Sequence, residues 1–175
     1  MEVKKIREVR RDFPIVPFDA ERRTTGQGEI RQELCIKWDD GDKKLVAIGI
    51  NPSTAQNGES DNTMTRLCRI VDMYGYNYVK MLNIYESVST PQSGINKKTL
   101  TDFQKKLDDI ECADMVLIAW GMNGYEEEKE RIKDVLKPYN EKVFCIARKK
   151  DDGFSYPRHP SRLSYKDEII KYDIS

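Results

Sequence analysis

The sequence LVAIGI at residues 45–50, followed directly by NPS at 51–53, decides how this chain folds. An unbroken apolar run of this length indicates a strand covered on both faces, because a half-exposed strand would alternate apolar and polar residues. Pro52 lacks a backbone N–H and has a fixed φ, so the loop leaves the strand along a defined path. The stretch therefore predicts a buried central strand with polar groups at its carboxyl end.

Strands and helices alternate on both sides of this run. Their patterns predict further strands at 33–38, 78–83, 115–120 and 142–147, and helices at 63–73, 97–110 and 125–136. This alternation is typical of a parallel sheet with helices on both faces. We expect a three-layer α/β/α sandwich around a central, mainly parallel four-stranded sheet, with an N-terminal β-hairpin extension.

The length of 175 residues fits a single domain, with an N-terminal extension at 1–32 and a core at 33–175. Thirty Lys and Arg residues balance thirty Asp and Glu residues, so no global field favours nucleic acid, although a local basic rim remains compatible. The first residues are charged where a signal peptide would be apolar, and no apolar run is long enough to cross a bilayer. We expect a soluble, cytoplasmic protein without membrane partners; the sequence favours a monomer but leaves the oligomeric state open.

The four cysteines, Cys35, Cys68, Cys112 and Cys145, form no C-x-x-C pair, which argues against a local zinc or iron–sulfur site. Phosphate-binding glycine loops and the G-x-S-x-G elbow are also missing from the sequence. We therefore predict no metal and no cofactor, and we expect the four thiols to be reduced and structural.

Polar residues follow two of the predicted strands. Asn51 and Ser53 come after the central strand, and Asn83 ends the strand at 78–83. Because ligand crevices in such sheets lie beyond the carboxyl ends of the strands, we expect these side chains to share one crevice. An amide offers both a donor and an acceptor, which suits the edge of a nucleobase. Taken singly, each residue is better explained by an Asn-Pro turn or by an Asn that satisfies a loop backbone.

The single histidine, His159, lies between two prolines in YPRHPSRL at 156–163. Basic residues surround it in the sequence, and together they would form a rim that faces phosphates; they are Arg148, Lys149, Lys150, Arg158, Arg162 and Lys166. For any one of them, a solvated charged surface is the alternative interpretation.

Four short motifs occur in the order found in the uracil-DNA glycosylase superfamily. GINP at 49–52 is similar to its water-positioning motif, MLN at 81–83 to the strand end whose Asn reads the base, and AWG at 119–121 to a strand that ends in WG. HPSRLS at 159–164 differs at one position from its HPSPLS loop. The same motifs, together with DNTMTR at 61–66, also resemble the family catalogued as domain of unknown function 1643, which has no settled activity.

The resemblance implies a monofunctional, metal-independent DNA glycosylase-like hydrolase of DNA repair, which would cleave the N-glycosidic bond of a damaged or modified base. By resemblance, Asn51 would position the attacking water and His159 would donate to the departing base. Asn83 would read the base edge, and Tyr85 is the candidate for stacking on it. Leu163 would fill the gap left by a flipped nucleotide, and the remaining DNA contacts would come from Ser53, Arg158, Ser161 and Arg162.

The departures from the superfamily pattern change these expectations. Asn51 replaces the Asp of the fastest uracil enzymes, so water activation should be weaker. Ser53 replaces a bulky Tyr that excludes a 5-methyl group, so the pocket should admit a larger or modified base. Arg162 replaces a proline, which exchanges loop stiffness for a phosphate contact.

Two alternatives to a DNA glycosylase follow from the same residues. The chain could be a non-catalytic module that binds nucleic acid or nucleotides on this fold. It could also hydrolyse free nucleosides or nucleotides, since the balanced charge does not require DNA. A basic rim converging on His159 would favour DNA, and a pocket closed to a polymer would favour the free nucleotide.

Overall fold

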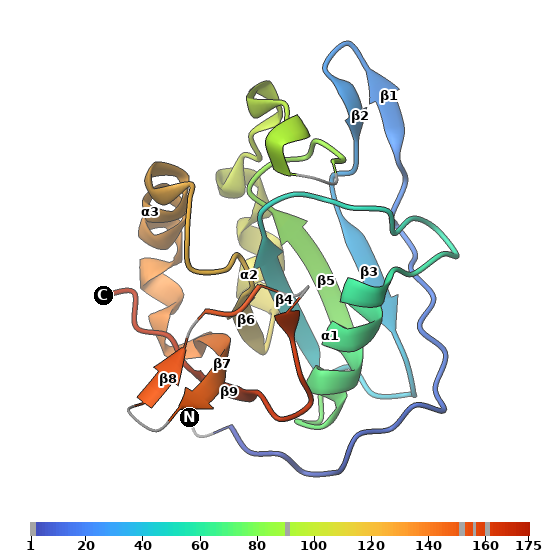
Figure 1. Cartoon of the computed structure of the whole chain (residues 1–175), viewed down its shortest axis with the longest axis vertical. Coiled ribbons are helices and arrows are strands. Elements are labelled where there is room, and N and C mark those ends of the chain that lie inside the picture. Colours follow the sequence, from blue (N-terminus) through green and yellow to red (C-terminus); the bar gives the residue numbers. More distant parts are fainter. Residues whose placement is uncertain (1–2, 90–91, 151–152, 156, 160–161) are drawn as a thin grey trace.

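The computed structural model describes residues 3–89, 92–150, 153–155, 157–159 and 162–175. It is a mixed α/β structure (Figure 1), which confirms the predicted class. The strands are β1 (Arg23–Thr25), β2 (Gly28–Ile30), β3 (Leu34–Lys37), β4 (Lys44–Gly49), β5 (Tyr78–Asn83), β6 (Met115–Ile118), β7 (Val143–Lys150), β8 (Gly153–Ser155) and β9 (Glu168–Lys171). The α-helices are α1 (Asn62–Asp72), α2 (Leu107–Cys112) and α3 (Glu126–Leu136). Short 3-10 turns cover Gln92–Gly94, Lys97–Thr99, Phe103–Lys106 and Lys137–Lys142.

The central sheet has the strand order β3-β5-β4-β6-β7. β5, β4, β6 and β7 run parallel, whereas β3 pairs antiparallel with β5 and both β8 and β9 pair antiparallel with β7. The sheet is therefore mixed and wider than the predicted four strands, because the chain adds antiparallel strands beside both outer members of the parallel set. β4 lies between two parallel neighbours, as its continuous apolar run predicts.

Side chains of β4 alternate between two apolar clusters, one on each face of the sheet. Leu45 and Ala47 belong to the cluster that contains the apolar stripe of α1. Val46 and Ile48 belong to the other cluster, which contains Ile110 of α2 and apolar residues of α3. Figure 1 shows α1 on one side of the sheet and α3 on the other. The parallel strands are therefore covered by helices on both faces, and their carboxyl ends lie at one edge.

The predicted helix at 97–110 is wrong over its first two thirds. Residues 97–106 form two 3-10 turns joined by an extended segment, and α2 begins only at Leu107. In that extended segment, the Thr101 N–H donates to the Ile84 carbonyl at 2.8 Å, and just before it the Thr99 carbonyl accepts from the Glu86 N–H at 2.9 Å. A backbone that pairs with the chain after β5 cannot also close helical hydrogen bonds, so this long-range pairing replaces the helix.

The segment before residue 33 packs against the rest of the chain. β1 and β2 form an antiparallel hairpin, which confirms the predicted hairpin in the N-terminal extension. Phe13 stacks on Trp38 with ring centroids 5.2 Å apart, and Arg10 donates to both carboxylate oxygens of the buried Asp72. The segment therefore contributes to the core on the α1 face of the sheet and does not hang free.

Cys35, Cys68 and Cys145 are buried and free, whereas Cys112 at the end of α2 is free and exposed. The expectation that the thiols are structural therefore holds for the three buried ones. Burial raises the pKa of Cys145 to about 12, which keeps that thiol protonated and unreactive at neutral pH. Within the described part of the chain, no helix has the length and apolar character to span a membrane.

Candidate functional site

A cavity of about 250 Å³ lies at the carboxyl ends of β4, β5 and β6. Its walls come from segments that are far apart in the sequence. The described residues that line it are Arg31, Gly49, Ile50, Asn51, Ser53, Asp61, Thr63, Met64, Met81, Asn83, Ser89, Gln92, Ala119 and His159. Four of the candidate site residues from the sequence, Asn51, Ser53, Asn83 and His159, thus share one crevice at this edge of the sheet.

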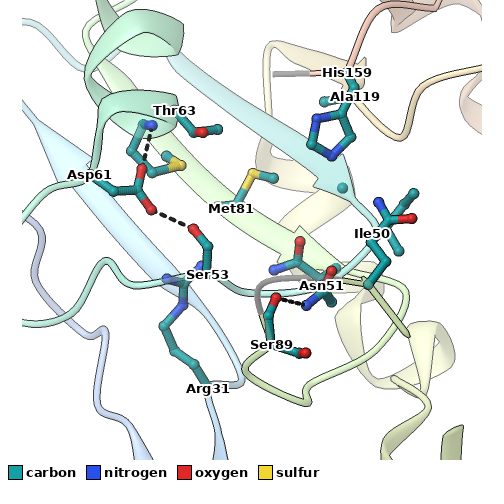
Figure 2. A pocket seen from close by; sticks show the side chains of 14 residues that line it. Arg31, Ile50, Asn51, Ser53, Asp61, Thr63, Met81, Ser89, Ala119 and His159 are labelled. Carbon is teal, nitrogen blue, oxygen red and sulfur yellow. Dashed lines mark hydrogen bonds between the residues drawn. The ribbon is translucent and has the colours of Figure 1, made fainter. Parts of the chain in front are cut away.

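Asn51 is held in a fixed orientation by the loop that follows β5. Its amide Nδ2 donates to the Ser89 carbonyl at 2.7 Å (Figure 2). It also donates to the Pro52 carbonyl at 3.0 Å and to the Ser87 carbonyl at 3.3 Å. Because the amide nitrogen donates to these three backbone carbonyls, the side-chain oxygen Oδ1 is the atom that can accept a hydrogen bond from a ligand or a water.

Asn83, at the end of β5, lines the cavity and has an amide donor that no described residue uses. The residue is 3% exposed, and its Nδ2 is buried without a hydrogen-bond partner among the described residues. A Cβ placed on Gly49 would approach Asn83 Oδ1 to 2.8 Å and Met81 Cε to 2.6 Å. The glycine of GINP therefore leaves the room that Asn83 and Met81 occupy. A buried amide donor without a partner is costly unless a ligand supplies the acceptor.

His159 lies on the far side of the cavity from Asp61 and Arg31 in the view of Figure 2. Its Cβ would lie 3.4 Å from a Cβ on Gly121, so the WG turn after β6 packs directly against the imidazole-bearing residue. Burial, reinforced by the positive charge of Arg162, lowers the pKa of His159. The imidazole is therefore neutral at pH 7, and its N–H is a donor without a positive charge.

Ser53 and Asp61 form a connected pair beside the N-terminus of α1. Ser53 Oγ donates to Asp61 Oδ2 at 2.5 Å, and Asp61 Oδ1 accepts from the Met64 N–H at 2.8 Å as the helix N-cap (Figure 2). The predicted phosphate contact of Ser53 is thus not supported, because this hydroxyl is already committed to a carboxylate.

Arg31 is a cavity residue that the sequence patterns do not single out, because it lies in the N-terminal extension, before the first strand of the predicted core. It follows β2 and lines the cavity with only 3% of its surface exposed. The hairpin returns the chain so that the Arg31 N–H donates to the Glu86 carbonyl at 2.9 Å, next to the loop that holds Asn51. The one available signal is an arginine directly after a short hairpin strand, which is too common a pattern to identify a site.

Tyr85 lies away from this cavity, so the predicted stacking on a ligand there is not supported. The residue is 1% exposed and belongs to the apolar cluster on the α3 face of the sheet. Its hydroxyl donates to Glu128 Oε1 at 2.9 Å, and its ring meets Tyr125 edge to face at 5.7 Å. Residues i and i+2 of a continuous strand point to the same face, which would place Tyr85 beside Asn83. β5 ends at Asn83, however, so this rule does not apply to Tyr85.

The predicted DNA contacts after β7 are mostly used inside the protein. Leu163 is 4% exposed in the α1-side cluster, so it is not available to fill a gap in DNA. Arg158 lies 3.5 Å from the buried Asp167 carboxylate and donates to the Arg162 carbonyl at 2.5 Å. Arg162 is exposed, and Ser161 lies outside the described residues. Of the two arginines beside His159 in the sequence, Arg158 is thus engaged inside the protein, whereas Arg162 is exposed and close enough for its charge to lower the pKa of His159.

The described residues contain no group of three or more His, Cys, Asp or Glu side chains arranged for a metal ion. The side chains present are instead suited to binding a small polar ligand. Asn51 Oδ1 is an oriented acceptor, Asn83 Nδ2 is a donor without a partner among the described residues, and neutral His159 is a donor across the cavity from Asp61 and Arg31. Arg31 adds a buried positive charge.

The model of one family, described as "Protein of unknown function (DUF1643)", matches residues 31–161. No curated protein and no solved structure matches the chain. The matched region begins at Arg31 and ends within the loop that carries His159, so it contains every described residue that lines the cavity. Because the match covers well over half of the sequence, this chain belongs to the DUF1643 family.

Proposed function

We propose that this protein is an N-glycosidic hydrolase, similar in chemistry to a monofunctional DNA glycosylase, that releases a modified base held in the cavity. The observation that carries the proposal is that Asn51, Asn83 and His159 meet around one small pocket, although Asn83 ends one strand and the other two residues follow different strands. Their order in the sequence also resembles that of the uracil-DNA glycosylase superfamily.

The side chains suit the two charges that develop when such a bond breaks. As the C–N bond breaks, the base leaves with its electron pair and the water attacks the sugar carbon, and the water's proton goes by way of solvent to the released base anion. Asn51 Oδ1 would orient that water by accepting a hydrogen bond, and three carbonyls hold the Asn51 amide in place. His159, neutral at pH 7, would donate to the oxygen of the departing base, where negative charge grows. Asn83 Nδ2 would donate to the base edge and so gain a hydrogen-bond acceptor.

The internal contacts of the proposed DNA-binding residues favour a free nucleoside or nucleotide over a polymer. Leu163 is buried, Ser53 is bonded to Asp61, and Arg158 lies beside Asp167. The cavity volume of about 250 Å³ lies just below the ~300–1,000 Å³ typical of pockets for drug-sized ligands, which suits one nucleotide or less.

A non-catalytic binding module is the second candidate, and Asn51 is the observation that favours it. An amide oxygen is a much weaker base than a carboxylate, so Asn51 can orient a water but cannot take its proton. Asn51→Ala separates the two functions, since it removes the oriented acceptor and should lower the rate of a hydrolase, whereas a binding module has no rate to lose. Asn51→Asp is not suitable, because a carboxylate oxygen would face the three carbonyls to which Asn51 Nδ2 donates.

The test is a panel of modified bases offered as free nucleosides, as 5′-nucleotides and within oligonucleotides, with released base as the readout. Asn51→Ala and His159→Ala should each reduce base release by roughly 100- to 1000-fold, as for loss of one positioned catalytic group. Ligand binding should change much less. Asn123→Ala is the matched control, because Asn123 is exposed and is not among the residues that line the cavity.

Equal base release by the wild type and both variants would reject the catalytic roles of Asn51 and His159. Binding to a nucleoside, nucleotide or oligonucleotide by the wild type, without base release from any substrate of the panel, would identify the non-catalytic module.

A further inference from the structure

Arg31 places a guanidinium inside the cavity without a carboxylate in direct contact to neutralise it. Its Nη1 donates to the Ala55 carbonyl at 2.7 Å, whereas its Nε is buried without a hydrogen-bond partner among the described residues. No ion pair within 4.0 Å joins Arg31 to an acidic side chain in the described part of the chain. A buried arginine normally has its donors paired, so an unused Nε at a pocket wall indicates a position where a ligand supplies the acceptor.

The nearby carboxylate of Asp61 is already occupied by other donors. It accepts from Ser53 Oγ, from the Ala55 N–H at 3.3 Å and from the Met64 N–H. Burial lowers the pKa of Arg31 to about 10 in spite of the field of Asp61, so the guanidinium remains charged at neutral pH. This corner of the cavity thus holds a desolvated positive charge that Asp61 offsets only from a distance.

The start of α1 adds to the positive potential. α1 is an 11-residue helix whose first turn contributes Thr63 and Met64 to the cavity wall. The N-terminal end of a helix carries a partial positive charge from its aligned peptide dipoles. Arg31 and the helix therefore favour the same kind of ligand group. Asn83, whose Nδ2 has no hydrogen-bond partner among the described residues, adds a further donor to the same cavity wall.

We infer that the cavity has a subsite for an anionic group, a carboxylate or a phosphate, which Arg31 binds beside the N-terminus of α1. This inference rests on the proposed function for the identity of the rest of the ligand, a nucleobase or nucleoside. The natural ligand is accordingly a base-containing anion whose charged group contacts Arg31 and whose base contacts Asn83. A carboxylate attached to the base and the 5′-phosphate of a nucleotide both satisfy this chemistry.

The first experiment compares wild-type affinities for two matched pairs of ligands by calorimetry. In one pair, 5-carboxy-2′-deoxyuridine is compared with the uncharged 5-hydroxymethyl-2′-deoxyuridine. In the other, 2′-deoxyuridine 5′-monophosphate is compared with 2′-deoxyuridine. At least one anionic member should bind about 10-fold or more tightly than its neutral partner, and the pair that shows the ratio identifies the source of the charge. Ratios near one in both pairs would overturn the inference.

The second experiment removes the guanidinium. Arg31→Gln should reduce the affinity ratio in that pair to near one, and Arg31→Lys, which keeps the charge but loses the planar fork, should retain part of it. Arg131→Gln is the matched control, since Arg131 is exposed on α3 and pairs with Glu127 of its own helix. A ratio that survives intact in a folded Arg31→Gln protein would also overturn the inference. Should Arg31→Gln not fold, because the Ala55 carbonyl loses its donor, the wild-type ratios and Arg31→Lys still decide.

These outcomes are independent of catalysis. A clear preference for the anion without base release would leave the subsite standing and reject the hydrolase. Base release from neutral and anionic substrates at equal affinity would support the hydrolase and reject the subsite.

Discussion

Gly121 and Gly124 form a natural pair of positions for testing the support of His159. Both have a left-handed backbone, with φ of +76° and +86°, so alanine should be strained at each by about 1–2 kcal/mol. Only at Gly121 would an added Cβ meet His159, at 3.4 Å from the His159 Cβ, and the space around Gly124 is open. At that distance the alanine Cβ only touches His159, whereas the two further methyl groups of a valine would extend toward it. Gly121→Val should therefore lose base release in addition to stability, whereas Gly124→Val should lose stability alone. Measured melting temperatures and rates for the two variants decide, and equal rates would remove Gly121 from the support of His159.

The single histidine makes a pH prediction specific to one group. Burial and Arg162 lower the pKa of His159 below its unfolded value of about 6.5, so the unfolded chain binds a proton first as pH falls. Stability should therefore decrease as pH falls from about 6.5 through the lowered pKa, and it should be insensitive to this group above that window. Proton NMR of the imidazole should give a midpoint below 6.5, and His159→Gln should lack this part of the pH dependence. A midpoint at or above 6.5 would contradict the neutral donor proposed for the leaving base.

At the residue scale, the cavity residues that lie at strand ends are predictable from the sequence, and those that depend on packing are not. The carboxyl ends of parallel strands meet at one edge of the sheet, so residues at or after those ends lie near the crevice even when the directions of their side chains are unknown. This makes Asn51, Asn83 and His159 identifiable as site residues from the sequence. Leu163 fills the core and not a gap in DNA, since a leucine in a loop can face either way. Arg31 escapes prediction because its placement depends on how the hairpin folds back, which no local pattern encodes.

Asp61 is the N-cap of α1 and also lines the cavity. Two substitutions of Asp61 therefore distinguish its effect on the stability of the helix from the effect of its charge on ligand binding. Asp61→Ala should cost about 1 kcal/mol of stability from the lost N-cap of α1 and should release the loop at 53–55. Asp61→Asn keeps an acceptor for the Met64 N–H and removes the negative charge near Arg31. It should retain most of the stability and bind an anionic ligand more tightly than the wild type does.

Denaturant unfolding and calorimetry measure the two effects of Asp61 separately. Asp102→Ala is the control, because Asp102 caps the turn at Phe103–Lys106 by accepting from the Gln104 N–H and is not among the residues that line the cavity. It should reduce stability and leave affinity unchanged. Weaker anion binding by Asp61→Asn would mean that Asp61 itself contacts the ligand.

At the element scale, long periodic or continuously apolar segments are predictable and interrupted ones are not. The strands predicted at 45–50 and 78–83 and the helix at 63–73 agree with β4, β5 and α1 to within one residue at each end. The segment at 97–110 has enough apolar residues for a helix, but Thr99, at the end of a 3-10 turn, and Thr101, just after it, pair with Glu86 and Ile84. That pairing joins parts of the chain that lie several helical turns apart in the sequence, and helical periodicity contains no information about it.

For the whole molecule, Asp72 is the point that fastens the N-terminal segment to the core. Its buried carboxylate accepts from Trp38 Nε1 at 3.0 Å, from Arg10 at 2.5 and 2.9 Å and from Arg7 at 3.3 Å. Asp72→Asn should lower the free energy of unfolding by about 2–3 kcal/mol, since the hydrogen bonds to a charged acceptor are lost. Asp134→Asn, which breaks an exposed pair with Lys137, should leave stability unchanged within error. Similar stability of both variants would mean that the segment is not held through Asp72.

The same carboxylate adds an acid-dependent contribution to stability. Burial opposes the ionisation of Asp72, but the hydrogen bonds from Arg10 and Trp38 and the charges of Arg10 and Arg7 outweigh it and lower its pKa. The contribution is therefore complete above the unfolded pKa of about 3.9 and is lost as pH falls through the lower folded value. Stability curves of the wild type should fall more steeply in this range than those of Asp72→Asn.

At this scale the mixed α/β class and the hairpin are predictable from the sequence, but the packing of the N-terminal extension into the core is not. Phe13 and Ala20 are buried in the cluster on the α1 face. Charged residues dominate the first 32 positions, so composition suggests a solvated segment, and the few apolar anchors among them give no periodic signal.

Cys112 gives the protein a ready-made attachment point. The other three thiols are buried in the core. Cys112 is the last residue of α2, just before β6 begins, and so lies at the end of the sheet away from the cavity. A maleimide dye or a thiol-capturing sensor surface should therefore react at one position without prior mutagenesis. Molecules tethered there would all present the cavity outward, so libraries of unmodified nucleosides and nucleotides could be screened on a uniformly oriented layer.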